Sequence, residues 1–344
     1  MDDHSKCRNG RETCLKSSID IIHLSDLHFG QHHRYIGDTP YETLLSKTLE
    51  DLDFLSNEYK VDPSLVIITG DLAEKSDPTE YSKVREFLDG LLEKFSLDAS
   101  KVVIVPGNHD VNWDMYRSSE LYHKAHRKPF NPPYFEKFRI FKEFCDDFYE
   151  GSYTFSEKLY NIFPYPELDL IIAGLNSCVK ETPDKHYGWI GLEQVHSAGR
   201  EIDEIDPKKK YLRIAAFHHN FLRRSQFDKE NLRDADQIRI ALGRYKFSIL
   251  MHGHRHVATI QQTFIPDSIP QIFISTGSAG LHHSVLPEHP NQYQILRISS
   301  KSIASLMRQY SSQSIGGTGQ GRWVADASIH DNGIAEVPRN LALW

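Results

Sequence analysis

Residues 65–71 read Leu65-Val66-Ile67-Ile68-Thr69-Gly70-Asp71, a short β-branched run that ends in a glycine and a carboxylate. A run of four to six such residues, bounded by turn residues, predicts a buried β-strand. Similar runs recur along the chain. They are residues 21–24, 102–105, 170–173, 212–217, 247–251 and 272–275.

Helical patterns lie between several of these runs. Apolar residues recur at the helical period within residues 44–55, 84–92 and, more weakly, 232–242. Strand and helix alternating along a chain predict an α/β sheet with helices on both faces. Residues 293–298 and 303–307 predict a final pair of strands.

Polar residues that can bind metals follow the predicted strands. In open α/β sheets, ligands bind outside the carboxyl ends of the strands, so we expect these side chains to share one rim. The groups are Asp26 with His28, Asp71 after Gly70, Asn108 with His109 and Asp110, His218 with His219, and His254 with His256.

These residue types predict a site for two divalent ions. In an extended chain, residues i and i+2 point the same way, so Asp26 and His28 could bind one ion, as could His254 and His256. Mixed oxygen and nitrogen ligands suit Mn, Fe, Zn, Ni or Co better than Mg or Ca, and we favour Mn. Seven candidate ligands exceed the needs of one ion and suit two ions roughly 3.5–4 Å apart.

The five motifs together resemble the signature of the calcineurin-like metallophosphoesterase superfamily. They are Asp26-Leu27-His28, Gly70-Asp71, Gly107-Asn108-His109-Asp110, the histidine at 218 and Gly253-His254-Arg255-His256. DxH or GD alone would carry little weight, whereas the full ordered set is specific. The resemblance spans roughly residues 20 to 310 and implies a four-layer αββα sandwich of two mixed β-sheets flanked by helices.

The resemblance also implies a role for each residue. It assigns Asp26, His28 and His256 to a first metal and Asn108, His218 and His254 to a second, with Asp71 bridging. The resemblance then places His109 beside the scissile phosphate and makes Asp110 the carboxylate that orients the His109 ring. His219 is the alternative to His218 as the ligand that follows its strand.

The chain departs from the Ser/Thr protein phosphatases of that superfamily. They carry GDxxDRG and GNHE, whereas residues 70–74 here read Gly-Asp-Leu-Ala-Glu and residues 107–110 end in aspartate. We therefore predict a dimetal phosphoester hydrolase, foremost a phosphodiesterase that acts on a nucleotide-type substrate through a metal-bridging hydroxide. The alternatives are a DNA or RNA nuclease that works with a partner, and a non-catalytic scaffold of the same fold.

Composition restricts the location and the partners. The 344 residues carry 40 Lys+Arg and 47 Asp+Glu, a net charge of −7, which argues against binding nucleic acid through bulk charge but not against a local basic groove. No stretch approaches the roughly 18 apolar residues of a membrane span, and the polar start lacks a signal-peptide core. With four scattered cysteines, we predict a cytoplasmic protein without a membrane partner.

The predicted organisation is a lead-in over residues 1–18, a catalytic domain over 19–310 and a Gly/Ser linker with a tail over 311–344. Within the domain, residues 111–150 form an aromatic-rich insertion near the site. Its phenylalanines from 135 to 148 have helical spacing and predict a helix docked on the core. Residues 122–128 are basic and could contact a phosphate or a base. The tail, with Trp323 and Trp344, is either a docking segment for a protein partner or an edge strand.

Overall fold

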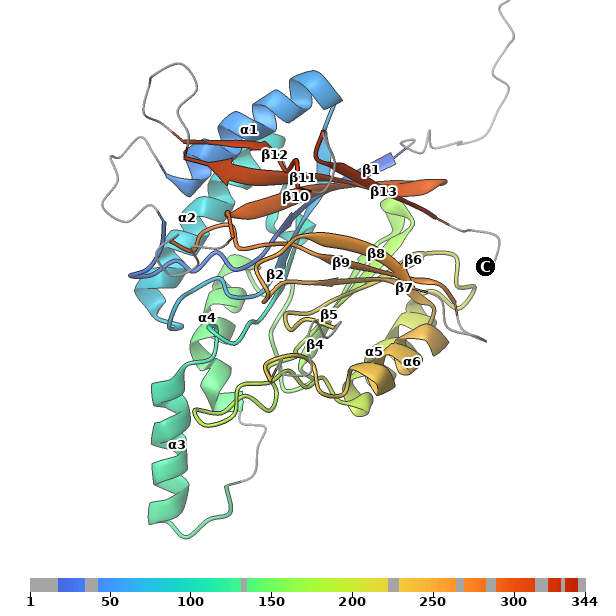
Figure 1. Ribbon diagram of the computed structural model, residues 1–344. Helices are drawn as coiled ribbons and strands as arrows, with labels where there is room; N and C mark the ends of the chain where they lie inside the picture. Colours follow the sequence, from blue (N-terminus) through green and yellow to red (C-terminus); the bar gives the residue numbers. More distant parts are fainter. Residues whose placement is uncertain are drawn as a thin grey trace, which may run out of the picture.

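The computed structural model describes residues 18–34, 43–130, 135–221, 229–263, 269–282, 289–312, 321–328 and 332–339. Two mixed β-sheets lie face to face in this part of the chain, and helices cover their outer sides (Figure 1). This is the predicted four-layer α/β architecture. Trp344 and nearly all of the predicted lead-in lie outside the described residues.

The first sheet has the strand order β12-β11-β10-β1-β2-β3, and β13 also pairs with β11. Strands β1, β2 and β3 are parallel to one another, while β10 pairs antiparallel with β1 and β11, and β11 pairs antiparallel with β12 and β13. The bounds are β1 (Ser18–Leu24), β2 (Pro63–Thr69), β3 (Val102–Val105), β10 (Gln292–Ser299), β11 (Ser302–Ser311), β12 (Arg322–Ala325) and β13 (Ile334–Pro338).

The second sheet has the order β4-β5-β6-β7-β9-β8. Strands β5, β6, β7 and β9 are parallel, and the two edge strands run against them. The bounds are β4 (Tyr160–Tyr165), β5 (Leu170–Leu175), β6 (Leu212–Ala216), β7 (Phe247–His252), β8 (Thr259–Thr263) and β9 (Gln271–Ser275).

The helices begin at residues that satisfy the free backbone N–H groups of their first turn. Thr43 caps α1 (Leu44–Tyr59), and Asp77 caps α2 (Pro78–Phe95), each in a reciprocal capping box. The apolar faces of α1 and α2 belong to the main core with both sheets, whereas α5 (Leu192–Ile205) and α6 (Ala235–Arg244) pack on the second sheet. Two short 3₁₀ turns, Ala99–Lys101 and Pro166–Leu168, precede β3 and β5.

The aromatic segment divides into three elements. Helix α3 (Trp113–Ala125) projects away from the sheets (Figure 1) and is followed by a 3₁₀ turn, Phe135–Phe138, and α4 (Arg139–Phe148). Phe138, Phe141 and Phe148 are fully buried in the main core. The helical spacing therefore predicted the docked stripe correctly, although its first residues form a 3₁₀ turn.

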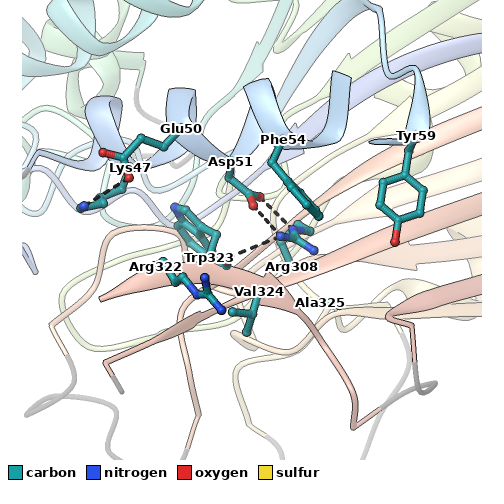
Figure 2. Close-up of a pocket in the computed structure, with 10 residues that line it drawn as sticks. All are labelled: Lys47, Glu50, Asp51, Phe54, Tyr59, Arg308, Arg322, Trp323, Val324 and Ala325. Atoms are coloured by element: carbon teal, nitrogen blue, oxygen red, sulfur yellow. Dashed lines mark hydrogen bonds and ion pairs between the residues drawn. The ribbon is translucent and has the colours of Figure 1, made fainter. Parts of the chain in front are cut away.

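The C-terminal strands are tied to α1 by a buried ion pair. Arg308 on β11 donates to both carboxylate oxygens of Asp51 on α1, and its Nη2 also lies 3.4 Å from the carbonyl oxygen of Trp323 (Figure 2). Trp323 is buried in β12, an edge strand of the first sheet. A surface cavity of about 430 Å³ lies between α1 and β12.

Candidate metal centre

The candidate ligands lie in the loops that follow five strands, β1, β2, β3, β6 and β7. Backbone hydrogen bonds join these loops: Asp26 N–H donates to Gly70 O at 2.9 Å, and Gly253 N–H donates to His218 O at 3.1 Å. His254 N–H donates to a carboxylate oxygen of Asp26 at 3.1 Å, which links the second sheet to the first. Strands of both sheets therefore contribute residues to one site, which lies at the carboxyl ends of these strands.

Asp26, His28 and His256 form a first cluster whose ligand atoms lie within 4.8 Å of one another. Asp26 Oδ1 is 3.9 Å from His28 Nε2 and 3.6 Å from His256 Nδ1, distances too long for hydrogen bonds. These three atoms are buried and have no hydrogen-bond partner among the described residues. Buried polar atoms are rarely left unpaired, so the cluster fits a metal ion.

Asn108, His218 and His254 form a second cluster. Asn108 Oδ1 lies 2.9 Å from His218 Nε2 and 3.0 Å from His254 Nδ1, and these two nitrogens are 3.1 Å apart. Asp71 lies between the clusters, with Oδ2 at 3.3 Å from His218 Nε2 and 3.8 Å from His28 Nε2. The structure thus brings all seven candidate ligands together, with Asp71 in the position that a bridging carboxylate would take.

The ligands owe their directions to left-handed backbone rather than to strand pleating. The φ angles are 53° at Asp26, 47° at His28, 53° at Asp71, 72° at His254 and 52° at His256. Such conformations cost non-glycine residues roughly 1–3 kcal/mol each and are common at functional sites. The expectation that an extended chain aligns the ligand pairs is therefore wrong, because β1 ends at Leu24 and β7 at His252, before the ligands begin.

His109 lies beside the first cluster, with its ring centroid 4.7 Å from that of His28. Its Nδ1 is 2.7 Å from the Glu74 carbonyl oxygen, and its backbone N–H donates to Asp71 Oδ1 at 2.8 Å. Burial lowers the pKa of His109, but the Asp71 carboxylate and the Glu74 carbonyl more than offset this and raise it above 6.5.

The Asp110 carboxylate accepts hydrogen bonds from the loops that follow β2 and β3 rather than from the His109 ring. Its oxygens accept hydrogen bonds from the N–H groups of Leu72, Ala73 and Gly107 and from the Tyr81 hydroxyl. Burial raises the pKa of Asp110 to about 6. The structure gives the orienting contact on His109 to the Glu74 carbonyl, which no sequence motif indicated, in place of the predicted Asp110.

The sequence profile of the calcineurin-like phosphoesterases matches residues 19–258. The chain belongs to this family. Among curated relatives, the metallophosphoesterase-like protein YydB of Bacillus subtilis is 26% identical over 286 residues, which is 78% of this chain and 55% of YydB. A cAMP/cGMP dual-specificity phosphodiesterase of Mycobacterium tuberculosis is 36% identical over 92 residues, 26% of each chain.

Solved structures share the fold of this chain. A purple acid phosphatase from yellow lupin superposes with a TM-score of 0.52 at 14% identity, covering 89% of this chain and 53% of that one. PhoD superposes with a TM-score of 0.52 at 11% identity, covering 86% of this chain and 67% of PhoD. This chain spans about half the length of YydB and of the lupin phosphatase. No helix in the described part of the chain is both long and apolar enough to cross a bilayer.

His218, rather than His219, lies among the candidate metal ligands. Both ring nitrogens of His219 have other partners: Nδ1 lies 2.9 Å from Ser177 Oγ, and Nε2 lies 3.1 Å from a carboxylate oxygen of Glu181. The other oxygen of Glu181 lies 3.3 Å from His186 Nδ1. Burial raises the pKa of Glu181 to about 7.

A buried lysine supports the loop that carries Glu181. Lys137 Nζ donates to the carbonyl oxygens of Cys178, Val179 and Glu181 at 2.8, 3.0 and 2.7 Å. Lys137 is 1% exposed, and burial lowers its pKa to about 8. Neither Lys137 nor Glu181 carried a sequence signal, because their roles depend on contacts between distant segments.

The metal clusters open into a cavity of about 310 Å³. Five of the residues that line it are candidate ligands or His109: Asp71, Asn108, His109, His254 and His256. The remaining wall consists of Trp113, Glu181, His186 and Glu230. The Trp113 and His186 rings meet edge to face with centroids 5.8 Å apart, so an aromatic surface stands beside the metal ligands.

Proposed function

We propose that this phosphoesterase is a dimetal phosphodiesterase that hydrolyses a nucleotide-type substrate. The observation that carries the proposal is the convergence of seven metal-competent side chains in two adjoining clusters, four of which line one cavity, with buried polar atoms that have no partner among the described residues. Buried polar atoms in a stable fold nearly always have a hydrogen-bond partner or another ligand. The oxygen of Asp26 and the imidazole nitrogens of His28 and His256 would all be satisfied by binding one cation.

Two ions would be held by the two clusters. Asp26, His28 and His256 would hold one ion, and Asn108, His218 and His254 the other, with Asp71 shared between them. When bound, two such ions lower the pKa of water and neutralise charge on phosphoryl oxygens. We favour Mn because the ligand set mixes carboxylate and amide oxygens with imidazole nitrogens.

His109 supplies proton transfer in this proposal. Because its Nδ1 is held by the Glu74 carbonyl, Nε2 is the ring nitrogen available to the cavity. A protonated Nε2 donates a proton to the leaving oxygen of the ester, a contribution typically worth about 10²–10⁴-fold.

Two features favour a nucleotide-type diester. Trp113 offers an aromatic surface in the cavity wall, and aromatic rings stack with bases. The matched segment of the mycobacterial relative also comes from a protein named for activity on cyclic nucleotides. We further propose, from cysteine usage, that the protein acts in the cytoplasm.

The test compares bis(p-nitrophenyl) phosphate with p-nitrophenyl phosphate, using purified Mn-loaded protein and Asp71→Asn as a control. Faster turnover of the diester that is lost in the variant supports the proposal. Preference for the monoester makes the protein a phosphatase instead. Two bound metals with no turnover of the model esters, of cyclic AMP or of oligonucleotides would favour the scaffold.

A nuclease is the second candidate function. The observation that favours it is a basic, aromatic arm that begins at the cavity, formed by residues 113–130. Hydrolysis of single-stranded oligonucleotides with higher kcat/KM than cyclic nucleotides would favour the nuclease over an enzyme for mononucleotides.

A further inference from the structure

Residues 113–130 form an arm, here called the α3 arm, that starts at the metal cavity and leaves the body of the protein. Trp113, the first residue of α3, lines the cavity, and the helix then runs outward (Figure 1). In α3, all of which the structure describes, Tyr116 is the one buried residue. The outer part of the arm is therefore exposed surface.

The arm holds its own shape. The Phe130 ring lies 5.5 Å from the Tyr116 ring and 5.5 Å from the His123 ring, so the returning chain packs along the helix. Lys128 N–H donates to His123 O, and His123 Nδ1 lies 2.9 Å from Pro129 O. These contacts within the arm fix the positions of the side chains at its tip, and none of them involves a residue of either sheet.

The tip is cationic in an acidic protein. Residues 121–130 include Lys124, Arg127 and Lys128 and no carboxylate, whereas the whole chain has a net charge of −7. None of these three cations forms an ion pair within the described ranges of the chain. Glu120 is the nearest carboxylate along the helix and leaves the tip with a net positive charge.

An exposed aromatic ring lies among these cations. Tyr122 is 52% exposed, its ring centroid is 4.1 Å from that of His126, and Lys128 Nζ lies 5.5 Å from its centroid. Cations that contact phosphates, next to rings on which bases stack, are the groups that bind single-stranded nucleic acid. Duplex DNA offers no unpaired base to stack on Tyr122.

We propose that the α3 arm binds single-stranded nucleic acid and guides the strand toward the metal cavity. This inference rests on the proposed function, the hydrolysis of phosphodiesters, and it favours the nuclease as the form of that function. From Trp113 to Ala125 the helix rises about 18 Å, which corresponds to roughly five nucleotides of a strand with stacked bases, at about 3.4 Å per phosphate. A strand bound at the tip can therefore reach the cavity only if it is several nucleotides long.

The binding test uses a fluorescent phosphorothioate oligothymidylate, which is anionic and resists hydrolysis. Its length of about twelve nucleotides lies within the usual site sizes of proteins that bind single strands. Fluorescence anisotropy gives Kd over a range of salt concentrations for the Mn-loaded protein. The variant K124A/R127A/K128A is expected to bind at least about tenfold more weakly, and its salt slope should fall by about 2, the value for three lost phosphate contacts on a single strand.

The matched control removes the same charge elsewhere. Lys208, Lys209 and Lys210 are exposed and precede β6, so they lie at the opposite end of that strand from His218 and the metal clusters. The variant K208A/K209A/K210A should keep the Kd and the salt slope of the unmodified protein. Equal weakening in both triple variants would mean that only net charge matters and would overturn the proposal.

Tyr122→Leu separates stacking from charge. Leucine keeps an apolar side chain but removes the ring, so affinity should fall about tenfold while the salt slope stays unchanged. An unchanged Kd would overturn the stacking part of the proposal.

Turnover distinguishes failure of the arm from failure of the proposed function. The ratio of kcat/KM for a phosphodiester-linked oligonucleotide to that for bis(p-nitrophenyl) phosphate should fall about tenfold in K124A/R127A/K128A and remain unchanged in K208A/K209A/K210A. A protein that hydrolyses the small diester but shows no arm-dependent oligonucleotide binding retains the proposed function and refutes the arm. Binding to phosphatidylserine vesicles, but not to the oligonucleotide, would assign the arm to an anionic lipid surface instead.

Discussion

The Nδ1 atom of His109 lies 2.7 Å from the carbonyl oxygen of Glu74. Since a carbonyl oxygen only accepts hydrogen bonds, Nδ1 carries a proton, and Nε2 is left for the cavity. The Glu74 carboxylate is itself held by the backbone N–H and Nδ1 of His32. A loop after β2 thereby sets the tautomer of a histidine that follows β3.

His109→Gln should lower kcat for a diester by about 10²–10⁴-fold and leave metal content unchanged, because glutamine cannot transfer a proton and no member of either metal cluster is altered. Steady-state kinetics with metal analysis of the same protein measures both effects. If the variant lost metal in proportion to activity, His109 would be a ligand rather than the proton donor.

Asp71→Asn should reduce both metal occupancy and turnover. Asp71 Oδ2 lies between His218 and His28, so its charge serves both clusters. We expect kcat to fall by more than about 100-fold, the upper end of what loss of an outer partner of a ligand costs. The exposed Asp89→Asn on α2, which loses a surface ion pair with Arg85, is the matched control and should remain active with two metals bound.

Lys137→Met should destabilise the fold by about 3 kcal/mol, because three buried carbonyl oxygens lose their donor at a cost of roughly 1–3 kcal/mol per unsatisfied group, partly offset by removal of a buried charge. Lys142→Met, at a half-exposed position with a surface ion pair to Asp146, should cost less than about 1 kcal/mol. Urea unfolding of both variants gives the comparison. Equal values would show that Lys137 does not hold the 178–181 loop.

Acid should destabilise the protein through His23. Its ring is fully buried between Thr69 and Gln294, and burial, with a smaller effect of His252, lowers its pKa to about 3. Between pH 6.5 and about 3 the unfolded chain binds more protons at this residue, so the free energy of unfolding falls as pH falls through this window. At about 1.4 kcal/mol per pKa unit, the loss is at most about 5 kcal/mol.

His23→Gln removes this titration while keeping a hydrogen-bonding side chain. The free energy of unfolding of the variant should therefore depend less on pH between 6.5 and 3 than that of the unmodified protein. Both are measured with a chelator present, so that metal release does not contribute. Parallel pH profiles would rule out His23 as a source of acid sensitivity. His33, whose pKa burial lowers to about 4, titrates in both proteins and cancels in the comparison.

Local patterns were sufficient for most strands of the two sheets, for α1 and α2 and for the list of candidate ligands, but they did not indicate β4, β8, β13 or α5. The run at residues 65–69 became β2, and the apolar period over residues 84–92 became the buried face of α2, because hydrophobic spacing reports directly on burial. Asp26, Asp71 and His218 were identifiable because each follows a buried strand, and the carboxyl ends of parallel strands share one edge.

Tertiary structure alone decided how those pieces meet. β10 pairs with β1 across more than 250 positions in the chain, and Glu74, Lys137 and Glu181 have their roles only through contacts with distant loops. The left-handed backbone at Asp26 and His254 likewise occurs where hydrogen bonds join loops that are distant in the sequence. Hydrophobic period and turn residues encode short-range preferences, whereas the partner of a buried polar group depends on which strands lie side by side.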